Sequence, residues 1–454
     1  MNTKALRQKI LDLAIHGKLV PQDPNDEPAS VLLERIRAEK ERLIKEGKIK
    51  KPKKSKAVCD KPHYPFELPK GWEWTTVGEI SWDLVYGTSK KSSSNGEIPV
   101  LRMGNINRCG KIEWDNLVYT SDKDDITKYS LQTNDLLFNR TNSSEWVGKT
   151  AIYKGEKNAI YAGYIVRLRI IILDADYVNF VMNSSYYRDW CNDVKTDAVN
   201  QSNINAQKLS HFFIPIPPLN EQKRIVNELS SWLNIIETIN NGKTELLLAI
   251  KQAKSKILDL AIHGKLVPQD PNDDPASELL KRINPKAEIT CDNPHYQKLP
   301  KGWAVAPMQM LCSLVDGKKR NDIERINLDV KYLRGEREAK TLMSGKYVAE
   351  NTLLILVDGE NSGEVFRTPV DGYQGSTFKQ LAINTNMDTD YILQVINLHR
   401  KTLRENKVGS AIPHLNKKLF KAIEVPVPPH YEQKRIVNAI NKAFTTLDGM
   451  AENL

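Results

Sequence analysis

Apolar residues spaced alternately four and three apart mark the middle of the chain as helical. Ile225, Leu229, Trp232 and Ile236 begin this pattern, and the same register resumes after a polar interruption at Lys243. Such spacing places the apolar side chains on one helix face and is typical of a coiled-coil seam. We expect one long helix or two stacked helices, roughly 54 Å long at ~1.5 Å per residue. The predicted seam comprises Ile225, Leu229, Trp232, Ile236, Ile239, Leu246, Ile250, Ile257 and Leu260.

A second copy of the pattern is divided between the two ends of the chain. The apolar positions of the last segment keep the register, and it continues in the first segment. Because the two copies have matching seams, we expect them to pack antiparallel. The second seam comprises Ile436, Ile440, Leu447, Leu6, Ile10 and Leu13.

Both seams stop at a His-Gly pair, His16-Gly17 and His263-Gly264. A glycine just past the last apolar position is typical of a left-handed residue that ends a helix. The two histidines would then lie in the last turn, where the helix dipole favours them. We interpret them as structural residues, with neither a metal nor a catalytic role.

Three blocks of sequence occur twice. Lys9 to Asp26 recurs without a change at Lys256 to Asp273. The pentapeptide LPKGW is found at residues 68–72 and 299–303, and the segments 214–227 and 425–438 share PxPPxxEQKRIVN. Between the second and third blocks the halves diverge, at Glu73 to Phe213 and Ala304 to Glu424. The repeat therefore predicts a conserved frame that carries two different inserts.

The spacing of the blocks also predicts how the repeat closes. When both ends of the chain are mapped onto the central copy, they nearly rebuild one central segment, lacking only the equivalent of Thr244 to Leu247. We expect an almost closed cyclic repeat with adjacent termini and a pseudo-two-fold axis between the halves. Long antiparallel coiled-coil helices would separate two copies of the insert.

Composition narrows the class of partner. The chain has 454 residues, 40% of them hydrophobic, which is enough for roughly two to four domains with real cores. Its formal charge of +10 favours a polyanionic partner such as nucleic acid, although a solubilising surface charge explains it equally well. Five cysteines without a CxxC pair favour a reducing compartment. No apolar signal core or membrane-length apolar run occurs, so we expect a cytoplasmic protein without a membrane partner.

The inserts have the signals of mixed α/β (α+β) domains with several short strands, joined by turns rich in glycine, asparagine and serine. Arginine, lysine, asparagine and glutamine in those turns can contact phosphates and base edges. The alternative is that polar residues simply occupy solvated turns. Candidates in the first insert are Arg102, Asn105, Asn107, Arg140, Asn142, Ser143, Lys149, Gln201 and Asn203. Candidates in the second are Lys318, Lys319, Arg320, Arg334, Arg337, Asn361, Ser362, Thr377, Lys379, Gln380, His414 and Asn416.

Two further features leave alternatives open. The lysine-rich run from Lys48 to Lys56 could bind phosphates or act as a solvated linker. The repeated motifs at Cys59 to Tyr64 and Cys291 to Tyr296 could form a zinc site if the copies met, but their expected separation argues against it.

We find no catalytic motif in the chain. A complete phosphate-binding GxxxxGK[ST] loop and a GxGxxG turn are both missing from the sequence. The Pro-Pro pairs lack the flanking residues of an amino-methyltransferase motif. Among scattered acids, Asp358 and Glu360 are the nearest imitation of a nuclease site. We therefore expect a non-catalytic chain that binds no cofactor or metal.

Taken together, these motifs resemble the specificity subunit of type I restriction-modification systems, over essentially the whole chain. The resemblance implies two target-recognition domains, each reading half of a split DNA target, with helices that fix the spacer. It also implies two modification subunits that use S-adenosylmethionine and two restriction subunits that use ATP and Mg. The expected division is a conserved helix and basic linker (1–65), recognition domain 1 (66–220), a central helical region (221–297), recognition domain 2 (298–429) and a C-terminal helix (430–454).

Two other functions remain open from the sequence. The chain could direct a methyltransferase that has no restriction partner, and co-purification with a translocase-nuclease would distinguish that case. It could instead be a coiled-coil scaffold whose inserts bind proteins. A scaffold would select no sequence from randomised duplexes.

Overall fold

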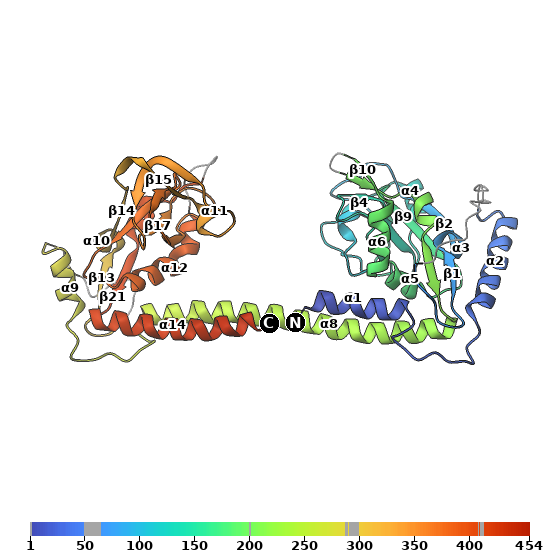
Figure 1. The fold of residues 1–454 in the computed structure, drawn as a ribbon, viewed down its shortest axis with the longest axis horizontal. Helices are drawn as coiled ribbons and strands as arrows, with labels where there is room; N and C mark the ends of the chain where they lie inside the picture. The colour runs from blue at the N-terminus through green and yellow to red at the C-terminus, as the bar shows by residue number, and fades with distance from the viewer. Residues whose placement is uncertain are drawn as a thin grey trace. The chain divides into compact units, whose positions relative to one another are not determined.

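The computed structural model describes residues 2–49, 65–198, 201–286, 289, 299–406, 408 and 413–454, apart from the side chain of Asp322. The chain forms two compact units, Met1–Asn241 and Gly242–Leu454. One helix, α8 (Leu219–Ile262), contributes to both units (Figure 1). The single-helix alternative for the central seam is therefore correct.

The insert of unit 1 contains four sheets. A four-stranded sheet has the order β2-β9-β5-β7, and a three-stranded sheet has the order β4-β3-β8. A pair, β1-β12, joins the start of the insert to its end, and a small sheet has the order β10-β11-β6. The strands are β1 (Glu73–Thr76), β2 (Ser81–Tyr86), β3 (Ile98–Leu101), β4 (Val118–Thr120), β5 (Leu136–Asn139), β6 (Thr141–Asn142), β7 (Thr150–Ile152), β8 (Ile160–Tyr161), β9 (Ile165–Ile170), β10 (Thr196–Ala198), β11 (Gln201–Asn203) and β12 (Phe213–Ile216).

The insert of unit 2 repeats the four-stranded sheet and the end pair of this topology. Its four-stranded sheet has the order β14-β20-β17-β18, its end pair is β13-β21, and β15, β16 and β19 form a closed arrangement. The strands are β13 (Ala304–Pro307), β14 (Cys312–Val315), β15 (Lys319–Leu328), β16 (Thr341–Val348), β17 (Leu353–Leu356), β18 (Val365–Arg367), β19 (Gly372–Gln374), β20 (Phe378–Ile383) and β21 (Glu424–Val427).

Helices cover these sheets and build the frame. In unit 1 they are α1 (Thr3–Ile15), α2 (Ala29–Lys45), α3 (Val77–Ile80), α4 (Lys123–Tyr129), α5 (Ala175–Val181), α6 (Ser185–Val194), α7 (Ala206–Ser210) and the 3-10 helix η1 (Met103–Asn105). In unit 2 they are α9 (Ala276–Ile283), α10 (Met308–Leu311), α11 (Val330–Leu333), α12 (Thr389–Glu405), α13 (Lys417–Ala422) and α14 (His430–Glu452).

The two inserts share one fold although their sequences have diverged. Strands β2, β9, β5 and β7 correspond in order to β14, β20, β17 and β18. In both inserts the first and last strands pair antiparallel, with Glu73 opposite Ile216 and Ala304 opposite Val427. Each insert therefore enters and leaves the frame at one point. The predicted fold class, two α/β (α+β) domains on helices, is confirmed.

Within each unit the frame helices pack antiparallel, as predicted. In unit 1, Thr3 Oγ1 donates to Asn240 Oδ1 at 2.7 Å, while the opposite end of α1 leads to residues that contact Glu221. In unit 2, Lys243 contacts the carbonyl of Leu454 and Lys254 contacts Asp448. The adjacency of the termini and the two-fold axis concern both units together, and they stay predictions.

The predicted seam is buried at most positions but not at all of them. Ile10, Ile225, Leu229, Ile236, Ile250, Ile436 and Ile440 are buried, and Leu6, Leu13, Ile239, Ile257, Leu260 and Leu447 are half-buried. Trp232 and Leu246 are each 40% exposed, so the prediction is wrong for these two. At Trp232 the indole turns outward and donates to Glu228 on its own helix, over 2.8 Å.

The glycine ends are confirmed. Gly17 has φ +64° and Gly264 has φ +63°, just beyond α1 and α8. His16 Nδ1 lies 2.6 Å from the Asp12 carbonyl oxygen, and the equivalent contact of His263 with Asp259 measures 2.7 Å. Both histidines therefore contact last-turn carbonyls, which agrees with a structural interpretation.

Candidate nucleic-acid interface

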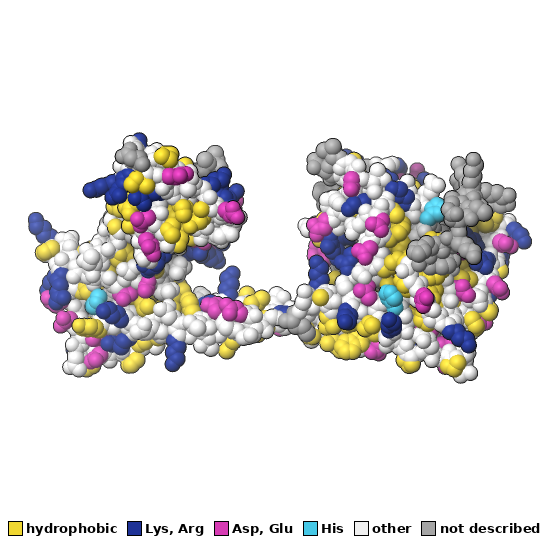
Figure 2. Space-filling model, in the orientation of Figure 1, with side chains coloured by type: hydrophobic (Ala, Val, Ile, Leu, Met, Phe, Trp, Pro, Cys, Tyr) yellow, Lys and Arg dark blue, Asp and Glu magenta, His cyan; other side chains and the backbone are white. Residues whose placement is uncertain are grey.

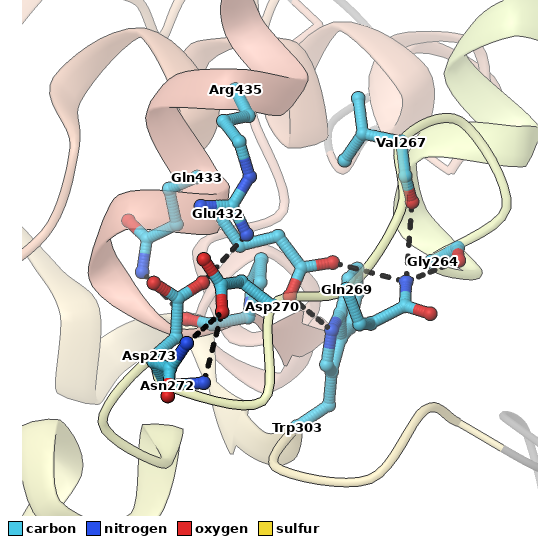
Figure 3. Close-up of polar contacts among 11 residues, drawn as sticks. Gly264, Val267, Gln269, Asp270, Asn272, Asp273, Trp303, Glu432, Gln433 and Arg435 are labelled. Atoms are coloured by element: carbon cyan, nitrogen blue, oxygen red, sulfur yellow. Dashed lines mark hydrogen bonds and ion pairs between the residues drawn. The ribbon is translucent and has the colours of Figure 1, made fainter.

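A buried polar network fixes the insert of unit 2 to its frame (Figure 3). Trp303, from the LPKGW block, donates its indole N–H to Glu432 Oε2 at 3.1 Å. Gln269, from the loop after α8, donates to the other carboxylate oxygen at 3.2 Å and to the Gly264 carbonyl at 2.7 Å. Burial raises the pKa of Glu432, whereas these hydrogen bonds act in the opposite direction. All three repeated blocks therefore meet at one carboxylate.

The same network recurs in unit 1. Trp72 donates to Glu221 Oε2 at 3.0 Å, and Gln22 donates to Glu221 Oε1 at 3.4 Å. Burial also raises the pKa of Glu221. We call these two sets the frame networks: Trp72, Gln22 and Glu221 in unit 1, and Trp303, Gln269 and Glu432 in unit 2. Their equivalence explains why three blocks that lie far apart in sequence are repeated together.

Neighbouring ion pairs and amides extend each network. Arg224 pairs with Asp26 and Arg435 pairs with Asp273, both at 2.6 Å. Gln222 accepts from the backbone N–H of Asp174 at the start of α5 and donates to Pro217. In unit 2, Gln433 makes the same two contacts with Asp388 and Pro428. In each EQKR sequence, the glutamate and the glutamine hold the entry of the insert and the insert itself on the frame helix, and the arginine holds the frame loop that follows α1 or α8.

On these frames, unit 1 gathers several candidate residues around one small sheet. In β11 and β6, Ser202 pairs with Asn142 and Asn203 pairs with Thr141. Asn203 donates to Thr141 Oγ1 at 2.8 Å, and Gln201 is exposed at the start of β11. The candidates that the structure brings together here are Arg140, Asn142, Ser143, Gln201 and Asn203.

Arg140 lies beside this sheet against an aromatic ring. Its guanidinium carbon is 4.9 Å from the centre of the Tyr86 ring, and Tyr86 is 39% exposed. A cation stacked on a tyrosine is held in place by the ring and keeps its charge available to a partner. The sheet therefore presents amides beside an oriented cation, which are suitable groups for base edges and phosphates.

The other candidates of unit 1 are more constrained. Asn105 is buried, accepts from the Arg102 N–H and donates to the carbonyls of Glu113 and Asp115, so it is removed from the candidates. Asn107 accepts from two backbone N–H groups of its own turn. Lys149 donates to the Met103 and Ile106 carbonyls, and burial lowers its pKa. Arg102 remains exposed, with one contact to the Asn116 carbonyl.

In unit 2 the exposed cations gather where β15 begins. Lys318, Lys319 and Arg320 are all exposed. The guanidinium carbon of Arg320 lies 3.8 Å from the centre of the Tyr347 ring. Gln380 donates to the Tyr347 carbonyl at 3.1 Å, so it lies beside the same residue. Lys379, by contrast, pairs with Asp316, and Lys346 and Lys379 together lower the pKa of that aspartate strongly.

Several candidates of unit 2 have structural roles. Arg334 pairs with Glu364, which raises the arginine's pKa, and Arg337 pairs with Asp329. Ser362 is fully buried and donates to the Gly359 carbonyl, so it too is removed from the candidates. Asn416 caps α13 by accepting from the Leu419 N–H at 3.0 Å.

The remaining three candidates lie nearer the surface. His414 is exposed, and its Nδ1 lies 2.6 Å from Asp358 Oδ1. This contact places Asp358, the nearest imitation of a nuclease acid, beside a histidine. Asn361 and Thr377 are half-buried.

The comparisons with known proteins decide the family. The model of the type I restriction modification DNA specificity domain matches residues 69–248 and 300–452, which is more than half of the chain. The chain belongs to this family. Its members are the non-catalytic subunits that recognise DNA in type I restriction-modification complexes.

Similar proteins support this specificity-subunit assignment. The specificity subunit of the type I restriction enzyme EcoAI of Escherichia coli is 27% identical, over 98% of this chain and 89% of that protein. The EcoEI specificity subunit of Escherichia coli is 32% identical, over 62% of this chain and 54% of that protein. A solved chain from a study of type I R-M complex assembly and conformational transition has a TM-score of 0.58 at 15% identity, covering 86% and 94% of the two chains.

The described part of the specificity subunit has no cluster of three or more His, Cys, Asp or Glu residues arranged to hold a metal. The alternative zinc motifs at Cys59 to Tyr64 and Cys291 to Tyr296 lie outside the described residues, as does most of the lysine-rich run. No described helix has the length and apolar character needed to cross a membrane.

Sequence reasoning missed the aromatic and arginine partners of the candidates. Tyr86 and Tyr347 orient arginines, and Trp146, which is 39% exposed, lies 4.0 Å from the Arg108 guanidinium carbon. Arg325 also lies over the Tyr347 ring, at 4.9 Å. An arginine and an aromatic residue far apart in sequence leave no local pattern, so this pairing was visible only after folding.

Proposed function

We propose that the specificity subunit reads a bipartite DNA target, one half with each insert, while the frame helices set the length of the spacer. The observation that carries this proposal is the combination of one strand order and equivalent frame networks with different exposed side chains. Two domains that share one attachment to the frame but expose different side chains are suited to recognise different base sequences.

The proposed contacts are the exposed or half-buried polar residues that are not committed to caps or to ion pairs, together with His414, which contacts Asp358. Arginine and lysine would neutralise phosphates, and asparagine and glutamine would bond adenine edges. In unit 1 we propose Arg102, Arg140, Asn142, Ser143, Gln201 and Asn203. In unit 2 we propose Lys318, Lys319, Arg320, Asn361, Thr377, Gln380 and His414.

The catalytic steps would belong to partner subunits. By the resemblance of the whole chain, two modification subunits would bring S-adenosylmethionine and methylate the target. Two restriction subunits would bring ATP and Mg and cut DNA. This subunit would direct both activities in the cytoplasm by choosing the sequence.

An exchange of inserts tests the division of labour. Residues Glu73 to Phe213 would be replaced by the insert of another specificity subunit, leaving Trp72 and Glu221 in place. Bound duplexes selected from a randomised pool should then change in one half of the consensus and keep the other half. Alteration of both halves, or selection of no sequence, would contradict the proposal.

A paired deletion tests the role of the helices. Removing Glu237 to Lys243 from α8 and the equivalent Asp448 to Leu454 from α14 shortens both rods by one heptad. A heptad spans ~10 Å at 1.5 Å per residue, so the spacer should shorten by about three base pairs while both half-sites stay the same. A spacer of unchanged length would show that the rods do not determine it.

A further inference from the structure

Unit 2 has a two-stranded ribbon longer than any in the described residues of unit 1. Strands β15 and β16 have ten and eight residues, whereas the corresponding β3 and β4 have four and three. The first four residues of β16, Thr341 to Ser344, are all exposed. This stretch of β16 is therefore exposed, although β15 reaches the core of unit 2 farther along, through Ile326 and Leu328.

A bulge within the ribbon places two apolar side chains opposite each other. The pairing passes from Asn321 opposite Ser344 to Arg325 opposite Leu342, so residues 322–324 face Met343 alone. Ile323 is 57% exposed and Met343 is 63% exposed, and the adjacent Leu342 is 42% exposed. Single exposed apolar residues are ordinary, but three beside one bulge of the ribbon form a patch that suits a partner. We call Ile323, Leu342 and Met343 the ribbon tip.

Cations surround the ribbon tip. Arg320 precedes the bulge and Arg325 follows it, with guanidinium carbons 3.8 and 4.9 Å from the centre of the Tyr347 ring. Ile323 shares a surface hollow with both arginines and with Lys319. Figure 2 shows lysine and arginine side chains beside hydrophobic ones in the region of unit 2 where Figure 1 places β15.

Few acids offset this charge. Asp371 lies 3.7 Å from Arg325 and also accepts from the Tyr347 hydroxyl. Glu324 accepts from Thr341. Among the side chains that the structure describes, no acid lies within ion-pair distance of Lys319 or Arg320. Among the described side chains here, the cations Lys319, Arg320 and Arg325 outnumber the acids Glu324 and Asp371 by one, so the described rim of the hollow is net positive.

We propose that the ribbon tip inserts between base pairs of the half-site that unit 2 reads, unstacking one step, while Arg320 and Arg325 bind the flanking phosphates. This inference rests on the proposed function and adds a second way in which unit 2 would recognise the DNA sequence. Apolar wedges such as isoleucine and methionine unstack base steps and bend duplexes by roughly 20 to 90°. Because the cost of unstacking depends on the sequence, such a wedge selects flexible pyrimidine–purine steps without a hydrogen bond to a base.

The combination of groups favours DNA over a protein partner. A purely electrostatic contact with phosphates needs no apolar tip, and an apolar protein surface needs no ring of cations. A base step flanked by phosphates requires both. The described residues of unit 1 form no ribbon of this length, so the unstacked step should occur in one half-site only.

The test uses the full chain with its methyltransferase partner and duplexes selected from a randomised pool. In the selected duplex, 2-aminopurine is placed at successive positions, and its fluorescence reports loss of stacking. We expect one step in the half-site of unit 2 to brighten on binding. Met343→Gln, which keeps the side-chain length, and Ile323→Asn should abolish the increase and weaken binding about tenfold. Met343→Leu, which keeps the apolar character, should preserve both.

The control is Ile172→Asn in unit 1, which removes another isoleucine that is 46% exposed and has φ +63°. It should leave the fluorescence and the affinity unchanged, and thermal melting should show that every variant is folded. The inference is overturned if no step brightens, or if the polar variants behave like the original protein. Loss of methyltransferase binding with unchanged DNA binding would also overturn it, since the tip would then contact protein. Selection of no sequence at all would instead refute the proposed function itself.

Discussion

Trp72 donates its indole N–H to Glu221 over 3.0 Å and so joins two residues that lie 149 positions apart in the chain. Trp303 and Glu432 make the equivalent bond at 3.1 Å. Each bond connects the entry of an insert to the helix that follows its exit. The insert between them can therefore change in sequence and length while its attachment to the frame stays the same.

Removal of either carboxylate should destabilise its own unit. Glu221→Ala leaves the buried Trp72 N–H without its acceptor and the Gln22 amide with only the Gly17 carbonyl, which should cost ~1–3 kcal/mol. Urea unfolding measures the change. Glu228→Ala, at an exposed position of α8, provides the comparison and should have a much smaller effect. Equal effects of the two substitutions would show that the frame network contributes little.

The same carboxylates should make stability depend on pH. Burial raises the pKa of Glu221 and of Glu432. The folded state therefore holds the proton more tightly than the unfolded state does, and this contribution is lost as pH rises from the ordinary glutamate value through the raised one. The double variant Glu221→Gln with Glu432→Gln should lose less stability over that rise than the original protein. Unfolding curves between about pH 4 and pH 8 measure this, and parallel profiles would contradict it.

Two glycines should respond in opposite directions to alanine. Gly17 has φ +64°, and a Cβ there would overlap the Pro69 ring, so Gly17→Ala should destabilise unit 1 by at least ~1–2 kcal/mol. Gly242 lies inside α8 with open space where the alanine methyl group would be added, so Gly242→Ala should stabilise the helix by up to ~1 kcal/mol. Thermal unfolding of both variants measures the shifts. A destabilising Gly242→Ala would mean that α8 is interrupted at that glycine.

The frame could be predicted from the sequence because its signals are local or repeated. The apolar register of α8 and the glycine that ends it are patterns of neighbouring residues. The repeated blocks showed that both inserts are attached to the frame in the same way. Trp232 and Leu246 were predicted wrongly because a heptad register states only which residues lie on the same face of a helix. It does not state which way each side chain turns: the Trp232 indole turns outward to Glu228, and Leu246 stays 40% exposed.

The candidate interface could be predicted only as a set of turns. Asn105 and Ser362 occupy predicted turns, but their side chains bond backbone groups of those turns and are buried. Arg334 and Arg337 were expected to be available, yet they pair with Glu364 and Asp329. The residue types that bind nucleic acid also form hydrogen bonds with turn backbones and ion pairs with acidic side chains. Only the tertiary contacts show which of these roles a residue has.

This distinction predicts different salt dependences for two groups of cations in unit 2. Lys318→Gln with Lys319→Gln removes two exposed charges, so the slope of log K against log salt should fall by about two. Arg334→Ala should leave the slope unchanged, because Glu364 already neutralises that guanidinium. Binding titrations at several salt concentrations measure both slopes. An unchanged slope in the double variant would remove these lysines from the proposed interface.

In unit 1 the same distinction separates sequence selection from stability. Gln201 is exposed on β11, the strand that pairs with β6 at Asn142, and its amide can bond an adenine edge at two points. Gln201→Ala should therefore lower discrimination at one base pair of one half-site by ~1–3 kcal/mol, with unchanged melting. Asn105→Ala removes a buried amide that makes three hydrogen bonds to the backbone, so it should lower the melting temperature while the selected consensus stays the same. Selection from randomised duplexes, together with thermal unfolding, measures both outcomes. If Asn105→Ala changed the consensus in a folded protein, the turn that Asn105 closes would itself be part of the reading surface.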